Sequence, residues 1–203
     1  NFCNLPDINS ATQLAILGLY DIIIFADDSG SMASVDSSTD NRTRFDILKE
    51  LIKMVSFWST LMDSDGILLR FFNSQQEGNS LGSIDAVESI FDTVSPYNGT
   101  PFGEEFQNKI FNQIVDPLLN SGKLNKPILT LVFTDGIPDS ESAVVKAISC
   151  CKDACTKSNY GSNAVAISIA QIGADKHASA YLGSLDKDPN IGNVVDCTSE
   201  FSI

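Results

Sequence analysis

Short apolar segments of strand length alternate with amphipathic helical segments along most of this chain. The strand-like segments are residues 20–27, 66–72, 127–134, 164–172 and 191–196. Helical spacing of apolar residues marks 44–61 and 102–119, and shorter helices are expected over 83–91, 140–156 and 174–185. This alternation is typical of βαβ units. We therefore predict an α/β fold with a doubly wound, mostly parallel central sheet, helices on both faces, and one short antiparallel edge strand near 79–82.

One domain accounts for the length of the chain. It has 203 residues, of which 43% are hydrophobic, and this is enough to bury a full core. We assign 20–203 to this domain and 1–19 to an N-terminal extension, whose helix-prone part, 10–19, is expected to pack on the domain. Only 197–203 follow the last predicted strand, which is too short for a long C-terminal helix.

The chain is strongly acidic, with a formal net charge of −13 and a pI of about 4.2. Its overall field repels phosphate backbones and anionic lipids, so we expect no nucleic-acid partner. No apolar run is long enough to cross a bilayer, so no membrane insertion is expected. The sequence favours a cytoplasmic location. Because it begins with Asn1 and the N-terminus could be processed, a secreted or cell-surface location stays open. The oligomeric state is not indicated.

The five cysteines allow more than one interpretation. Cys150, Cys151 and Cys155 fall on one predicted helix, and we interpret them as small apolar side chains in a reducing compartment. A disulfide between Cys3 and Cys197 is the alternative for a secreted form. A zinc site is a weaker one, because no Cys-x-x-Cys pair occurs.

Oxygen-bearing side chains gather where strands are predicted to end. Asp27, Ser29 and Ser31 form D-x-S-x-S directly after the first strand, and Asp135 closes the strand over 127–134. Thr100 precedes the helix over 102–119. The carboxyl ends of parallel strands meet at one edge of a sheet, so these residues are expected to converge there. Few carboxylates and several hydroxyls suit a six-coordinate divalent cation, Mg²⁺ or Mn²⁺, with Ca²⁺ also open.

At these positions the chain resembles the von Willebrand factor A (vWA) family, whose metal-ion-dependent adhesion site uses D-x-S-x-S, a Thr and an Asp from three loops. It looks most like the single-domain vWA proteins of fungi and other microbial eukaryotes, in phrases such as DIIIFADDSGSM, DSDGILLRFFN and TDGIPD. The resemblance implies that Ser29, Ser31 and Thr100 bind the metal directly and that Asp27 and Asp135 bind it directly or through water. A Glu or Asp of a protein partner would complete the shell. Affinity switching in the family is tied to a final helix, which makes such a switch doubtful here.

The resemblance thus implies a divalent-metal-dependent protein-binding module, and two other functions are the alternatives. A phosphohydrolase of the haloacid dehalogenase type also starts from an Asp at the end of a first strand, but it needs a second Asp where this chain has Ser29, and no Lys is well placed for phosphoryl transfer. Catalysis by Ser29 would need a base, and only His177 is available. We therefore expect no enzyme. A vWA scaffold whose metal is purely structural is the third interpretation.

Two further acids close to the motifs are predicted to have structural roles. Asp28 lies on the opposite phase of the loop from Asp27, so it should point away from the metal. Asp139 or Ser140 is expected to cap the helix over 140–156, and Asp139 is assigned this structural role.

Overall fold

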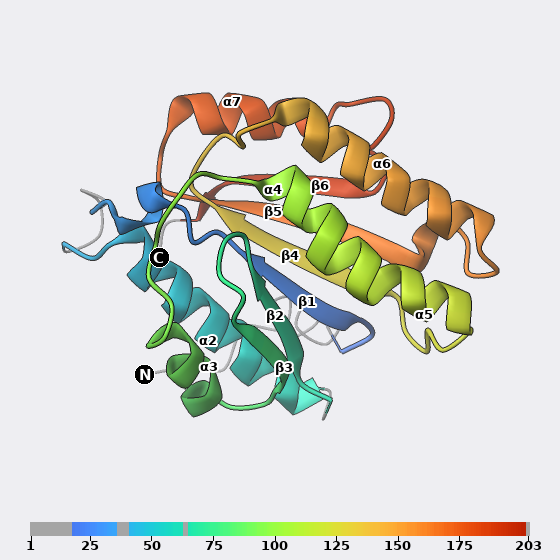
Figure 1. The fold of residues 1–203 in the computed structure, drawn as a ribbon, viewed down its shortest axis with the longest axis horizontal. Coiled ribbons are helices and arrows are strands. Elements are labelled where there is room, and N and C mark those ends of the chain that lie inside the picture. The colour runs from blue at the N-terminus through green and yellow to red at the C-terminus, as the bar shows by residue number, and fades with distance from the viewer. Residues whose placement is uncertain (1–17, 36–40, 63–64, 202–203) are drawn as a thin grey trace, which may run out of the picture.

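The computed structural model describes residues 18–35, 41–62 and 65–201, which form a six-stranded sheet between two layers of helices (Figure 1). Its strands are β1 (Asp21–Ala26), β2 (Ile67–Phe71), β3 (Glu77–Leu81), β4 (Ile128–Thr134), β5 (Val165–Ile172) and β6 (Val195–Phe201). They lie in the order β3-β2-β1-β4-β5-β6. Strand order reverses between β1 and β4, which is where ligands bind in open α/β sheets.

Only β3 runs antiparallel among the strands described; it pairs with β2 at the edge of the sheet. The predicted α/β class, with its mostly parallel sheet and short antiparallel edge strand, is therefore confirmed. The edge strand begins two residues before the predicted 79–82, at Glu77.

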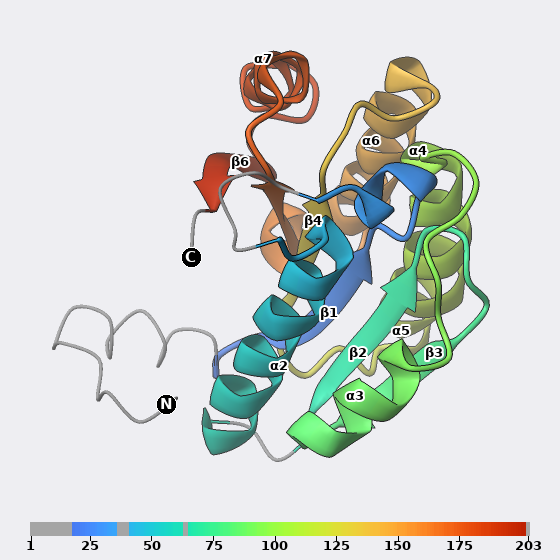
Figure 2. The same ribbon diagram turned by 90° about the vertical axis from the view of Figure 1, so that its left-hand side faces the viewer.

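Helices cover both faces of the sheet (Figure 2). One layer holds α2 (Arg44–Met62) and α3 (Ile84–Phe91). The other holds α4 (Phe102–Glu105), the π-helical η2 (Phe106–Val115), α5 (Asp116–Ser121), α6 (Glu141–Lys157) and α7 (Lys176–Leu185). Two short 3₁₀ turns, η1 (Gly30–Ala33) and η3 (Ser162–Ala164), complete the elements.

The central strand β1 has a hydrophobic core on each side. Ile22 and Ile24 pack in the core under α2 and α3, whereas Ile23 and Phe25 pack in the core under η2, α6 and α7. Successive side chains of a strand point to opposite faces, so a strand covered on both sides needs a continuous apolar run. The run from Ile22 to Ala26 meets this need.

The helix predicted over 102–119 differs from a regular α-helix. Its middle, η2, is π-helical: the Asp116 N–H at its end bonds to the carbonyl of Phe111, five residues back. The wider turn still presents Phe106 and Ile110 to the core, so the apolar spacing resembles that of an α-helix. It also carries Lys109 inward, with only 6% of that residue exposed. π-helical turns occur often near functional sites.

The last strand was predicted too early, at 191–196, and β6 in fact covers Val195–Phe201. Ile191 is apolar because it is buried in the core from a turn. Gly192 closes that turn with its N–H on the Asp188 carbonyl at 2.8 Å, and a Cβ there would lie 2.4 Å from the Asp186 carbonyl oxygen. Of the residues expected to follow the strand, those from Cys197 to Phe201 thus belong to it, and 202–203 lie outside the described residues.

Several predictions fall partly or wholly outside the residues that the structure describes. The N-terminal extension, except for its last two residues, lies outside the described residues, as does Cys3. Cys197 has a free thiol, and of the helical cysteines Cys151 and Cys155 are buried while Cys150 is exposed. Across the described ranges, no helix combines the length and the apolar character that crossing a bilayer requires.

Candidate metal centre

The loop after β1 holds the first three predicted ligands. The Asp27 N–H bonds to the Phe133 carbonyl at 2.9 Å, so the sheet ladder continues past the end of β1 and sets Asp27 beside the end of β4. The Ser29 N–H donates to Asp27 Oδ1 at 2.8 Å and closes the loop. The chain then enters η1, anchored by the buried Met32, and leaves Ser31 exposed.

Hydrogen bonds join this loop to the loop that follows β4. Thr134 Oγ1 donates to Asp27 Oδ2 at 2.5 Å, and Ser31 Oγ donates to Asp135 Oδ1 at 2.8 Å. The Ser29 and Ser31 hydroxyl oxygens lie 3.0 Å apart. The structure thus brings together four of the five predicted residues, namely Asp27, Ser29, Ser31 and Asp135.

Thr100 reaches the same region through its backbone. Its loop is tied to the first one by the Gly30 N–H, which bonds to the Asn98 carbonyl at 3.0 Å. The Thr100 hydroxyl makes no hydrogen bond to the other four residues in the described ranges, although Thr100 itself is only 8% exposed. The fifth predicted residue is therefore near the cluster but not part of its hydrogen-bonded chain.

Asp139 has a role at this site that the sequence interpretation missed, because it offered Asp139 or Ser140 as the cap of the helix over 140–156. The helix α6 is capped by Ser140, whose hydroxyl accepts from the Ala143 N–H at 3.3 Å. Asp139 instead accepts from the Thr100 N–H at 3.0 Å, and its own N–H bonds to the Thr100 carbonyl at 3.0 Å. A Cβ on Gly99 would lie 2.6 Å from this carboxylate, so a larger residue there would require the Asp139 side chain to shift. Asp139 therefore holds Thr100 in position.

Arg44 is the second residue that sequence interpretation missed. It begins α2, and its Nη1 lies 2.6 Å from Asp135 Oδ2. The Asp135 side chain is fully buried, whereas that of Arg44 is 22% exposed. A cation is unfavourable in the first turn of a helix, so an arginine at this position was the available sign of a carboxylate partner nearby.

The electrostatics of Asp27 follow from its surroundings. Burial raises its pKa to about 6, against hydrogen bonds from Ser29 and Thr134 that favour the charged form; the nearby charge of Asp135 adds to the rise. Two buried carboxylates are thus held close together, an arrangement that a cation between them would stabilise.

The Asp28 side chain points away from this cluster and binds the loop after β2. Its carboxylate accepts the N–H groups of Asn73 and Ser74, at 2.6 and 2.8 Å, and burial raises its pKa. Beside it, Lys109 Nζ donates to three backbone carbonyls of the same turn, those of Phe71, Phe72 and Ser74. The loop after β2 is thereby fixed behind the first loop.

The donor set fits a hard divalent cation. It consists of hydroxyl and carboxylate oxygens only, and it already holds one cationic group, the Arg44 guanidinium, on Asp135. A cluster of three or more His, Cys, Asp or Glu side chains suited to a metal is not found in the part of the chain that the structure describes. The candidate site contains only two carboxylates, those of Asp27 and Asp135. Its other oxygen ligands would therefore be the hydroxyls of Ser29, Ser31 and Thr100.

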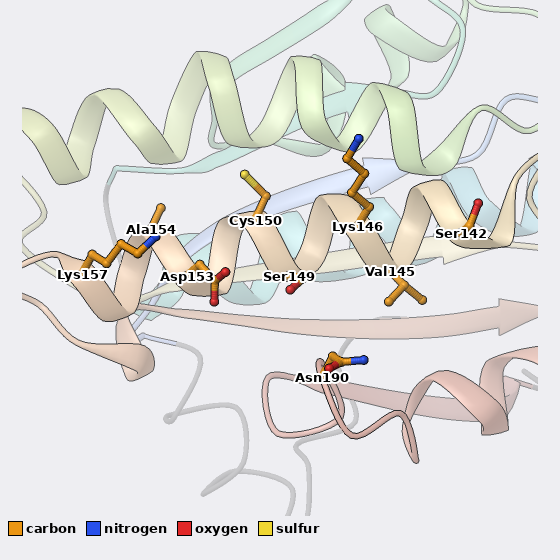
Figure 3. Close-up of a pocket in the computed structure, with 9 residues that line it drawn as sticks. All are labelled: Ser142, Val145, Lys146, Ser149, Cys150, Asp153, Ala154, Lys157 and Asn190. Atoms are coloured by element: carbon orange, nitrogen blue, oxygen red, sulfur yellow. The ribbon is translucent and has the colours of Figure 1, made fainter.

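A groove of about 810 Å³ lies elsewhere on the molecule, along the outer side of α6 (Figure 3). Val145, Ser149 and Asp153 face Asn190 of the loop after α7 across it, and Cys150 lies on the opposite flank of the helix. None of the five predicted ligands lines this groove.

Comparison with known proteins identifies the fold. No family model matches the sequence, and no match to a curated protein was found. Among solved structures, the manganese-loaded TRAP protein of Plasmodium vivax is similar over 90% of this chain and 69% of its own, with 18% identity and a TM-score of 0.54. The RO (RSR) protein of Deinococcus radiodurans is similar over 78% of this chain and 28% of its own, with 12% identity and a TM-score of 0.46, too low to argue from. The likeness to the TRAP protein shows that this chain shares that protein's α/β fold.

Proposed function

We propose that this chain is a divalent-metal-dependent protein-binding module. Asp27, Ser29, Ser31, Thr100 and Asp135 would hold Mg²⁺ or Mn²⁺, and the bound cation would offer a coordination position to a Glu or Asp of a partner. The observation that carries the proposal is the hydrogen-bonded chain from Asp27 through Ser29 and Ser31 to Asp135, which joins two loops at the strand-order reversal. The metal-loaded state of the TRAP protein lends it support.

The chain's negative charge supports the requirement for a cation at the contact with an acidic ligand. With a net charge of −13, the protein repels a carboxylate unless a positive centre lies at the contact. Ser31 and Gly30 are exposed at the rim of the cluster, so a partner side chain can approach from that side. The rest of the partner's contact surface is then expected to be neutral or basic.

The surroundings of Lys109 count against a phosphohydrolase. A phosphoryl-transfer site needs a cationic side chain free to meet the transferring group. Lys109 is the buried lysine beside the first loop, but its ammonium already contacts three carbonyls and lies 3.2 Å from Glu105 Oε2. We therefore propose a binding module and not an enzyme. A purely structural metal is distinguished by the experiment below.

The test is affinity capture from the native extract, with the protein as bait, in Mg²⁺ and in chelator. The wild type is compared with Asp27→Ala and with Asp85→Ala, which removes the same charge from an exposed site on α3. We expect a partner retained in Mg²⁺ by the wild type and by Asp85→Ala, and lost in chelator and with Asp27→Ala. A partner retained equally in every condition would leave the metal a structural role, and phosphoester turnover that depends on Asp27 would support the enzyme.

A further inference from the structure

We propose that Arg44 is a built-in counter-cation of the metal site. Its guanidinium pairs with Asp135 when no metal is bound and has to leave that carboxylate when a divalent metal enters. The inference rests on the proposed function, because it concerns the same cluster, and it adds a residue outside the predicted ligand set.

The geometry places Arg44 where it competes with a metal. Both oxygens of Asp135 are in use: Oδ1 accepts from Ser31 Oγ at 2.8 Å, and Oδ2 lies 2.6 Å from Arg44 Nη1. Because the Asp135 side chain is fully buried, its charge is screened little by solvent and needs a positive partner. A guanidinium and a divalent cation on one carboxylate repel each other, and both oxygens of Asp135 are already engaged, so a metal that binds this carboxylate competes with Arg44.

The position of Arg44 in α2 has no explanation within the helix itself. The first turn is already capped by a reciprocal pair, Thr43 and Asp46. Asp46 Oδ2 accepts from the Thr43 N–H at 2.9 Å, and Thr43 Oγ1 accepts from the Asp46 N–H at 3.1 Å. A positive charge there opposes the helix dipole. Asp135 therefore accounts for the placement.

The pair is also built to be displaced. Arg44 Nε is buried and has no hydrogen-bond partner among the described residues. The guanidinium therefore gains its contact with Asp135 through Nη1 but leaves the Nε–H without water or a protein acceptor. Its 22% exposure leaves a path to solvent. Leaving Asp135 lets Arg44 recover hydration, which lowers the cost of exchanging it for a metal.

Competition of this kind lowers the apparent affinity for the metal, because only the fraction of molecules with Arg44 displaced can bind it. Removing the guanidinium should therefore tighten metal binding. A hydrogen-bonded charge pair of ordinary strength corresponds to about tenfold or more in affinity.

The experiment is calorimetric titration of the full chain with Mn²⁺, comparing wild type, Arg44→Gln and the control Lys176→Gln. Lys176 is exposed at the start of α7, next to Asp175. The pKa of Asp175 is lowered mainly by hydrogen bonds from the Ala178 and His177 N–H groups and to a smaller degree by the charge of Arg44, so the control removes a positive charge from the same region without touching Asp135. We expect Arg44→Gln to bind Mn²⁺ about tenfold or more tightly than wild type, and Lys176→Gln to differ little.

Melting curves supply a second readout. In chelator Arg44→Gln should melt below wild type, because Asp135 is left buried and unpaired, and saturating Mn²⁺ should narrow that difference. Arg44→Lys, which keeps the charge but lacks the planar guanidinium, should tighten binding by less, and it decides the matter if Arg44→Gln fails to fold.

Equal or weaker Mn²⁺ binding by the Arg44 variants, with a wild type that binds, would overturn this inference and leave the proposed function standing. An equal gain with Lys176→Gln would also overturn it, because that gain would be a general charge effect. If neither the wild type nor the Arg44 variants bind Mn²⁺, both proposals fall.

Discussion

Two buried carboxylates define the chemistry of the cluster at the scale of single residues. Asp27 is held by Ser29 and Thr134, and Asp135 by Ser31 and Arg44. Each acid thus has its hydrogen bonds satisfied, but their charges repel, and burial raises the pKa of Asp27 to about 6. The negative charge of Asp27 is therefore unfavourable at neutral pH unless a cation lies beside it.

That charge predicts how stability depends on pH in chelator. Because the folded-state pKa of Asp27 is raised from 3.8 to about 6, the native state keeps a proton that the unfolded chain releases in this interval. This residue's contribution to stability therefore falls as pH rises from about 4 to about 6. Melting temperatures measured in chelator at pH 5 and pH 7 check this. The melting temperature should fall less from pH 5 to pH 7 in Asp27→Asn than in wild type. Equal losses would contradict the burial of an ionised Asp27.

Asp139 predicts a second effect at this scale, on metal affinity and not on charge. Asp139→Ala removes the acceptor for the Thr100 N–H and releases the loop that carries Thr100. Mn²⁺ should then bind more weakly, with a loss of binding free energy of about 1–3 kcal/mol at most. Asp139→Asn keeps an acceptor oxygen and should restore most of the affinity. Titration calorimetry checks both, and an Asn variant as weak as the Ala variant would show that the hydrogen bond is not what matters.

Residues of the cluster differ in how far the sequence could reveal them. Asp27, Ser29, Ser31 and Asp135 were predictable because strand ends in a parallel sheet meet at one edge. The roles of Asp139 and Arg44 depend on contacts 39 and 91 residues apart in sequence, which no local spacing announces.

Among the elements, the close approach of α4 to α6 sets where the loop that carries Thr100 ends. A Cβ at Gly103 of α4 would lie 2.4 Å from backbone atoms of Ala143 and Val144 in α6. The helix that follows Thr100 is therefore seated directly on the helix that follows Asp139, and the two loops are aligned by this packing.

A matched pair of glycines tests this packing. Gly103→Ala must push two helix backbones apart and should destabilise the fold by about 1–3 kcal/mol or more. Gly183→Ala, in α7 with nothing within 4 Å of the added methyl, should be neutral or stabilise by about 0.5–1 kcal/mol. Urea unfolding of both variants checks the difference. Similar stabilities for the two would show that the contact between α4 and α6 is looser than described.

Boundaries of elements were harder to predict than their existence. The apolar run of β1 was unambiguous because both faces are buried, whereas Ile191 looked like strand and lies in a turn. Both environments require an apolar side chain, so hydrophobicity alone does not separate them. The π-helical η2 was missed for a related reason: its buried face repeats much as that of an α-helix does.

For the whole molecule, the fold and the charge combine into one account. The doubly wound sheet brings loops from β1, β4 and the start of α4 to one edge. Under the proposed function, a cation at this edge would offset the net charge of −13 and let an acidic side chain of a partner bind. The contact of Arg44 with Asp135 shows that one of these carboxylates already attracts a positive group.

Crystals grown with Mn²⁺ and measured at the manganese absorption edge test the proposed metal site most directly. We predict an anomalous peak among the side chains of Asp27, Ser29, Ser31, Thr100 and Asp135, with Arg44 moved off Asp135, and loss of the peak in Asp27→Ala crystals. A peak at any other place, or none at these side chains at saturating Mn²⁺, would contradict the account.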